Sequence, residues 1–86
     1  MNEIIWHNRA RKQMKKIPIH YREAIHSSVD QLADFPKCKK LDISELKDHL
    51  YDYRLRVGRY RVLFNYASIV KIIEIQEVKK RDERTY

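Results

Sequence analysis

The sequence predicts a small α+β domain in which two N-terminal helices cover one face of an antiparallel sheet of about four strands. Three observations support this prediction. Apolar residues recur at helical spacing in the first half of the chain, they alternate in the second half, and a lone glycine separates two alternating runs. The expected order is strand, helix, helix and three consecutive antiparallel strands, within a single domain spanning residues 1–86.

The N-terminal half is expected to form one short strand and two helices. Residues 3–6, in which three apolar residues follow Glu3, predict the strand, and residues 7–16 predict a polar, strongly basic helix. Pro18 suits the first turn of a second helix, which Phe35-Pro36 ends. Residues 37–48 are expected to form a basic loop before the strands begin.

The C-terminal half alternates between apolar and polar residues over 49–57, 60–66 and 69–78, which predicts three strands. Between the first two strands, Gly58 and Arg59 have the length of a two-residue hairpin turn. This turn fixes the register of the hairpin. It pairs Val57 with Tyr60, Arg56 with Arg61, Leu55 with Val62, and Tyr53 with Phe64.

The predicted hairpin has one apolar face and one cationic face. Because side chains alternate along a strand, Arg54, Arg56 and Arg61 project from the face that the helices leave open, while Arg59 lies in the turn. Like charges directly opposite across a ladder are destabilising, so Arg56 facing Arg61 indicates an anion site. The competing interpretation is a solvated face whose arginines pair with acids. Since residues 53–71 contain no Asp or Glu, such acids must come from a distant segment.

The last predicted strand alternates less regularly. We expect Ile73, Ile75 and Glu77 on one face, and we expect the remaining residues on the other. Those remaining residues are Ile72, Glu74, Gln76 and Val78.

Composition narrows the class of function. The chain has 86 residues, a net charge of +7 and a pI near 9.7, which favours a polyanionic partner. A single cysteine, Cys38, excludes an internal disulfide framework and suits a reducing cytoplasm. No apolar run is long enough to cross a bilayer, so we expect a soluble protein without a membrane partner. No His, Cys and Asp cluster has metal-ligand spacing, so neither a metal nor a cofactor is predicted.

Taken together, four features resemble the RelE/ParE superfamily of bacterial toxins, and particularly its RelE-like mRNA interferases. They are the basic helical pair, Leu46-Lys47 before the hairpin, the run YRLRVGRYRVLF, and the terminal KKRDERTY. The resemblance covers essentially the whole chain. It implies a ribosome-dependent endonuclease that cuts mRNA and has an antitoxin as its partner. In such systems operator DNA is bound only through the antitoxin complex, and here the antitoxin is expected to be acidic.

The resemblance also implies roles for residues whose motifs match. Arg61 falls on the hairpin arginine that holds the scissile phosphate, and Arg54 and Arg56 fall on the basic pair of the preceding strand. Arg81 falls on the arginine of the C-terminal basic segment, and Tyr86 falls on the terminal tyrosine that stacks on a nucleobase. Basic residues expected to contact RNA are Lys47, Lys79 and Lys80.

Proton transfer is the part of this chemistry that the sequence leaves open. RelE itself has lysines at the positions held here by Asp52 and Arg54, and its C-terminal segment is one residue longer. An arginine is always protonated and makes a poor base. The candidates for acid or base are Asp52, His49, Glu83, Tyr86 and Lys80. Two other functions stay open: a ParE-like inhibitor of DNA gyrase, and a basic RNA-binding module without catalysis.

Overall fold

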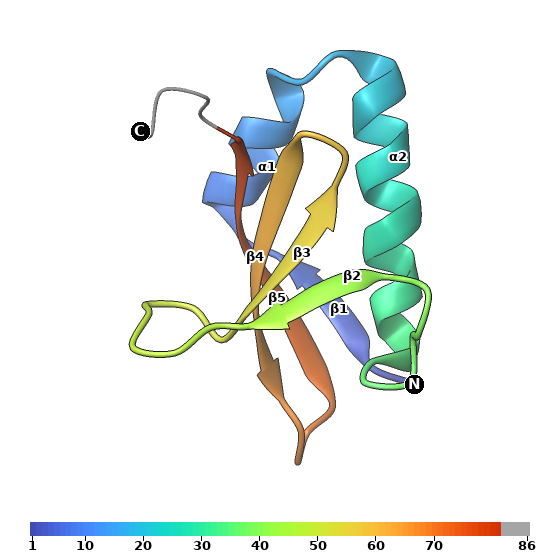
Figure 1. Ribbon diagram of the computed structural model, residues 1–86, viewed down its shortest axis with the longest axis vertical. Coiled ribbons are helices and arrows are strands. Elements are labelled where there is room, and N and C mark those ends of the chain that lie inside the picture. Colours follow the sequence, from blue (N-terminus) through green and yellow to red (C-terminus); the bar gives the residue numbers. More distant parts are fainter. Residues whose placement is uncertain (82–86) are drawn as a thin grey trace.

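The computed structural model describes residues 1–81 and shows an α+β fold with two α-helices and a five-stranded mixed sheet (Figure 1). The strand order is β1-β5-β4-β3-β2. In chain order the elements are β1 (Glu3–Trp6), α1 (Asn8–Lys15), α2 (Ile19–Asp30), the 3-10 helix η1 (Gln31–Asp34), β2 (Asp42–Glu45), β3 (Tyr53–Val57), β4 (Tyr60–Ala67) and β5 (Ile72–Lys80).

The sheet differs from the predicted one in two ways. Residues 42–45, expected to be part of a loop, form β2, which pairs antiparallel with β3. A run of four residues is too short to give a visible alternation, so the sequence did not indicate this strand. The first strand pairs with the last, and β1 runs parallel to β5. Hydrophobic periodicity indicates that a strand exists but not which strand it pairs with, so this parallel pair was also unforeseen.

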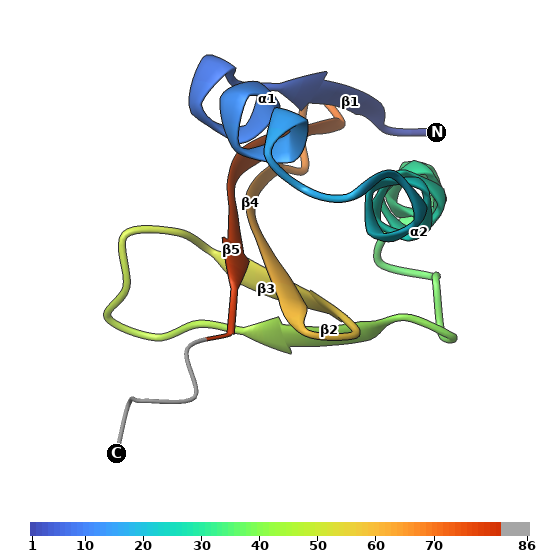
Figure 2. The same ribbon diagram turned by 90° about the horizontal axis from the view of Figure 1, so that it is seen from above.

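Both helices lie on one side of the sheet, as predicted, and leave the opposite face open. Figure 2 shows α2 inside the curve of the sheet, while the loop between β2 and β3 projects from the other side. The residues of α2 and η1 that enter the core, Ile25, Val29 and Leu32, recur at helical spacing and are fully buried. From the sheet, the fully buried core side chains are Leu55, Val62, Phe64, Ile73 and Ile75.

Helix α1 lies along the edge of β5 beyond the residues that pair with β1. Its two apolar residues, Ala10 and Met14, are buried in the core. The Gln13 Oε1 accepts a hydrogen bond of 2.6 Å from the Val78 backbone N–H. This contact satisfies a strand-edge donor that β1 does not reach, so α1 protects the edge next to the cationic end of β5.

The β3–β4 hairpin has the predicted register. Tyr53 pairs with Phe64, Arg56 with Arg61, and Val57 with Tyr60. Gly58 has a φ of 57°, a left-handed conformation that glycine adopts at little cost. The turn therefore places the arginines on the face predicted for them.

Strand β5 differs from its predicted alternation. Leu63 pairs with Glu77 while the next residue, Phe64, pairs with Ile75, so Gln76 is an extra residue that forms a β-bulge. Beyond the bulge the alternation is reversed. Val78 is buried in the core, and Glu77 lies on the open face. The predicted placement of these last two residues was therefore wrong.

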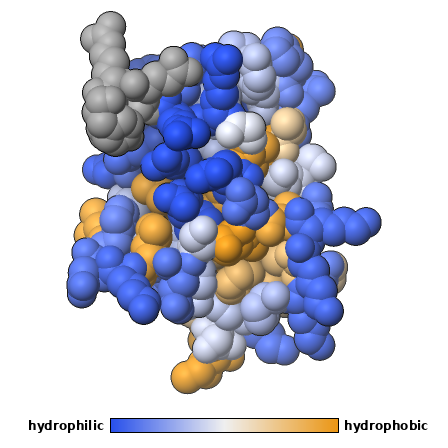
Figure 3. All heavy atoms as spheres, in the orientation of Figure 1, coloured by the Kyte–Doolittle hydropathy of each residue, from blue (hydrophilic) through white to orange (hydrophobic). Residues whose placement is uncertain are grey.

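The surface is mostly hydrophilic and has a hydrophobic tip at the β4–β5 hairpin. Hydrophilic residues dominate much of the view in Figure 3, while the tip of the β4–β5 hairpin at its lowest point is hydrophobic. This tip exposes Ile69 and Val70. Within residues 1–81, neither helix has the length and apolarity required to span a membrane.

Candidate functional site

The open face is crossed by a row of four charged side chains, one from each of β2, β3, β4 and β5. Asp42 pairs with Arg56, Arg56 with Arg61, and Arg61 with Lys79. We call these four residues the charged row. Three adjacent members are cations, and Asp42 at the edge of the sheet is the only acid. The Arg56 Nε lies 3.8 Å from the Asp42 Oδ2, and both side chains are well exposed, so this pair is weak.

Arg61 is the central cation of the row. Its side chain is half-buried, and its Nε is buried without a hydrogen-bond partner among the described residues. Arg56 and Lys79 flank it on either side. A buried, unpaired donor on a guanidinium group is costly, and a bound anion would remove this cost. The geometry therefore matches the anion site that the like-charge pair indicated.

A second row of side chains lies next to the first, one step further from the hairpin turn. It contains Ser44, Arg54, Leu63 and Glu77, one each from β2, β3, β4 and β5. Arg54 donates to the Ser44 Oγ over 3.4 Å. The Glu77 Oε1 lies 3.6 Å from the Lys79 Nζ, and only 13% of the Glu77 side chain is exposed. The two rows together form a cationic surface with one half-buried carboxylate inside it.

Asp52, a candidate acid or base, lies on the chain before β3. The Asp52 Oδ2 accepts from the Tyr66 backbone N–H over 3.3 Å, and the Asp52 backbone N–H donates to the Asn65 Oδ1 over 2.8 Å. These bonds hold the end of the β2–β3 loop against β4. Arg56 lies four positions after Asp52, which is about 13 Å along a strand.

Two histidines belong to the same side of the molecule. His49, in the β2–β3 loop, accepts at Nδ1 from the Tyr51 backbone N–H over 3.1 Å. His7, at the start of α1, has its Nε2 2.9 Å from the Glu74 Oε2. A cleft of about 400 Å³ lies between the start of α1 and this loop, lined by His7, Asn8, Arg9, Leu50, Tyr51 and Gln76.

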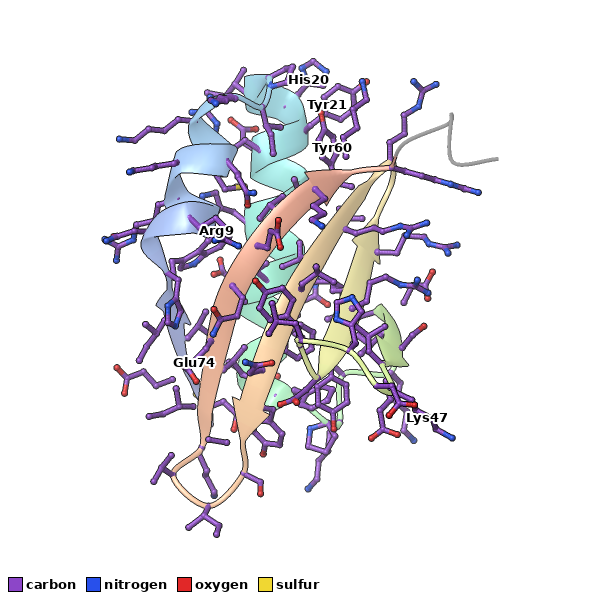
Figure 4. The ribbon with its side chains drawn as sticks, turned by 90° about the vertical axis from the view of Figure 1, so that its left-hand side faces the viewer. Arg9, His20, Tyr21, Lys47, Tyr60 and Glu74 are labelled. Carbon is purple, nitrogen blue, oxygen red and sulfur yellow. The ribbon has the colours of Figure 1, made fainter. Side chains whose placement is uncertain are left out.

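The remaining basic candidates fall at different places. Lys80 ends β5, and the Arg81 backbone N–H donates to the Arg59 carbonyl over 2.7 Å, so the chain still follows the hairpin turn there. Figure 4 looks onto the open face and places Lys47 beside β2, away from that turn. Lys79 therefore belongs to the charged row and Arg81 lies beyond it toward the hairpin turn, whereas Lys47 is distant from the row (Figure 4). Glu83 and Tyr86 lie outside the described residues.

Among the described residues, Tyr53 and Cys38 have raised pKa values. Burial, aided by the charges of Glu45 and Asp52, raises the pKa of Tyr53 above 10.0. Burial also raises the pKa of the Cys38 thiol above 9.0, and the charge of Asp34 adds to the effect. Within residues 1–81 no three His, Cys, Asp or Glu side chains are arranged so that they could hold a metal ion.

Sequence reasoning missed two carboxylates of this surface. Asp42 was assigned to a loop, although its distance from the arginines along the chain agrees with the expectation that any acid would come from a distant segment. Glu77 was assigned to the wrong face because a bulge has no reliable signature in a single sequence. The weaker alternation of residues 72–78 was the available signal.

Comparison with protein-family models identifies the ParE toxin of the type II toxin–antitoxin system parDE, matched over residues 4–84. Comparison with curated protein sequences gave no match.

Solved structures show the same fold. RelE in the archaeal RelE–RelB complex from Pyrococcus horikoshii OT3 is 26% identical with a TM-score of 0.81, over 95% of this chain and 97% of that one. The RelB–RelE antitoxin–toxin complex from Methanococcus jannaschii gives 24% identity and a TM-score of 0.73, over 88% of both chains. The isolated RelE toxin of Escherichia coli is 15% identical with a TM-score of 0.79, over 99% of this chain and 89% of that one. By its sequence and its RelE-like structure, the chain belongs to the RelE/ParE superfamily of type II toxin–antitoxin toxins.

Proposed function

We propose that this toxin is a ribosome-dependent endoribonuclease that inhibits translation by cleaving mRNA through attack of a ribose 2′-hydroxyl on the adjacent phosphate. The observation that supports this function best is the charged row with Arg61 at its centre. Attack on the phosphate builds negative charge on its non-bridging oxygens, and clustered guanidinium groups stabilise such charge. The products would be a 2′,3′-cyclic phosphate and a 5′-hydroxyl.

Each basic residue has a place in this proposal. Arg61 and Arg56 hold the scissile phosphate, and Arg54 supports the neighbouring phosphate. Arg81, beside the hairpin turn, neutralises charge near the leaving 5′-oxygen. Lys79 extends the cationic surface along the RNA, Lys80 contacts the RNA from the end of β5, Lys47 contacts the RNA or ribosome further away, and Tyr86 stacks on a base.

The test is primer-extension mapping of an mRNA in a translating extract with purified toxin. Arg61→Ala should lower the cleavage rate by about 10²–10³-fold, the usual effect of removing one preorganised donor. Arg59→Ala is the matched control, because Arg59 is an exposed arginine in the turn and is not a member of the charged row. Absence of cleavage by the wild-type toxin, or equal cleavage by both variants, would contradict the proposal.

A gyrase inhibitor is the second candidate, because the matching family model is described as a ParE toxin. The two functions separate cleanly in the laboratory. Gyrase-dependent DNA breaks with intact mRNA would favour the inhibitor, and cleaved mRNA with normal supercoiling would favour the nuclease. RNA binding without mRNA cleavage or gyrase inhibition would favour a basic RNA-binding module without catalysis.

The proposed partner is an acidic antitoxin that covers the cationic surface. The net charge of +7 favours such a partner. Operator DNA would then be bound by the complex rather than by the toxin. Specific binding of an operator by the isolated toxin in a gel-shift experiment would argue against this arrangement. Because ribosomes and mRNA are the proposed targets, the site of action would be the cytoplasm.

A further inference from the structure

We propose that Glu77 is the general base that removes the proton from the attacking 2′-hydroxyl. This inference rests on the proposed nuclease function and supplies its missing step. It arises from the β-bulge at Gln76, which turns the Glu77 carboxylate onto the open face beside the charged row.

The position of Glu77 suits proton transfer at a phosphate held by Arg61. Glu77 lies directly across from Leu63, so it is the diagonal neighbour of Arg61, with a typical separation of about 7–8 Å. A phosphate and the 2′-hydroxyl that attacks it fit in a space of that size. Figure 4 looks onto this face, with β5 and β4 side by side in front of α2.

The surroundings of Glu77 keep its carboxylate available and in place. Only 13% of the side chain is exposed, and Lys79 lies 3.6 Å away. Arg61 of β4 is diagonal to Glu77, and Arg54 of β3 lies beyond Leu63 in the same row; both are cations. Arg56 and Asp42 lie further along the charged row, and Glu74, paired with His7, lies on this face before the bulge. From the β2–β3 loop, buried Tyr51 lies on the side of Gln76, and both residues line the same cleft. The Glu77 carboxylate is thus held beside the cations that would bind the phosphate.

The other described carboxylates on this side are less well placed. The Asp42 side chain is 61% exposed, at the outer edge of the sheet. Asp52 accepts from the Tyr66 backbone N–H and lies about 13 Å along the strand from Arg56. Glu74 is paired with His7, before the bulge. Glu77 is therefore the carboxylate that is both half-buried and next to Arg61.

The step is a simple transfer. The 2′-hydroxyl gives its proton to a Glu77 oxygen while its own oxygen bonds to phosphorus. The bond between phosphorus and the 5′-oxygen breaks, and that oxygen takes a proton from water. Protonated Glu77 then returns its proton to the solvent, which restores the carboxylate.

The decisive variant is Glu77→Gln, which keeps the shape of the side chain but cannot accept the proton. Single-turnover cleavage of mRNA on programmed ribosomes would be followed at neutral pH. We expect a rate about 10²–10⁴-fold below wild type, the usual contribution of a positioned base. In Glu77→Ala, whose shortened side chain leaves room for a small carboxylate, added formate should restore part of the lost rate and added chloride should not.

Glu74→Gln is the matched control, because it makes the same change on the same strand and face, before the bulge. We expect it to keep the wild-type rate. Glu77→Asp retains a carboxylate but draws it back by one methylene group, so it should be slower than wild type and faster than Glu77→Gln. If Glu77→Gln does not fold, as judged by circular dichroism, the aspartate variant decides alone, and a wild-type rate would overturn the proposal.

The outcomes separate the two proposals. A wild-type toxin that does not cleave mRNA would refute the nuclease function itself. A wild-type toxin that cleaves, with Glu77→Gln within threefold of it, would refute only the role of Glu77. A slow Glu77→Ala variant that chloride restores as well as formate does would mean that Glu77 only balances charge, and it would also refute the base.

Discussion

On the open face of this toxin, one arginine has a buried N–H group that none of its described neighbours accepts. The Arg61 Nε is buried and unpartnered within the described chain, between Arg56 and Lys79. The hairpin turn at Gly58 let the sequence predict the Arg56–Arg61 pair. It could not predict Lys79 opposite Arg61, because that pairing depends on the bulge in β5. The central cation was therefore predictable, and its burial was not.

Cys38 gives a residue-scale prediction about pH. Burial raises the pKa of its thiol above 9.0 in the folded chain, so the folded state keeps the proton longer than the unfolded state does. The thiol's contribution to stability is thus complete below the unfolded pKa and is lost as the pH rises through the folded pKa. We expect the urea midpoint to decrease as the pH is raised above about 8.5, and to decrease less for Cys38→Ser.

The same shift predicts slow chemistry at the thiol. At pH 9.0, the ordinary pKa of a cysteine thiol, native Cys38 should react with iodoacetamide more slowly than the urea-unfolded chain does. Equal rates in the two states would show that burial does not protect the thiolate.

At the scale of elements, the alternation of core-facing and open-face side chains along β5 is reversed at Gln76. Below the bulge Ile73 and Ile75 face the core, and above it Val78 does. A strict period of two cannot describe such a strand, which is why the sequence placed Glu77 and Val78 on the wrong faces. The β3–β4 hairpin has no bulge, and its faces were predicted correctly.

Deleting single residues from β5 tests this description. Removing Gln76 should restore a regular strand with Glu77 still opposite Leu63 and Val78 still opposite Val62, so the fold should survive. Removing Val78 instead brings a charged side chain to a core position opposite Val62, and this variant should be severely destabilised. Urea unfolding of both proteins makes the comparison. A Gln76 deletion as damaging as the Val78 deletion would contradict the assigned register.

The hairpin turn gives a second prediction for an element. Gly58 has a φ of 57°, and a Cβ built there meets no atom within 4 Å. The effect of Gly58→Ala is therefore conformational, and the free energy of unfolding should fall by about 1 kcal/mol. Gly58→Asn should cost less, because asparagine tolerates this conformation. Chemical denaturation measures both, and equal losses would point to a steric cause instead.

For the whole molecule, the net charge of +7 predicts a stability that depends on salt. Raising sodium chloride from about 50 to about 500 mM screens repulsion between exposed cations, so the melting temperature should rise. Arg56→Gln should weaken this dependence, because Arg56 faces Arg61. Lys12→Gln makes the same charge change on exposed α1 and should weaken it less. Identical salt slopes would show that the charged row carries no special repulsion.

The parallel pairing of β1 with β5 has a kinetic consequence. Glu3 meets Ile72, so two segments near opposite ends of the chain must find one another before the sheet is complete. Such distant contacts form slowly, because closing a long loop is entropically unfavourable. Until they form, β5 has an unpaired edge along residues 72–75, and the folding chain is vulnerable to pairing with another copy. The edge of the strand that carries Glu77 and Lys79 would then be protected only in the last step of folding, when β1 pairs with it.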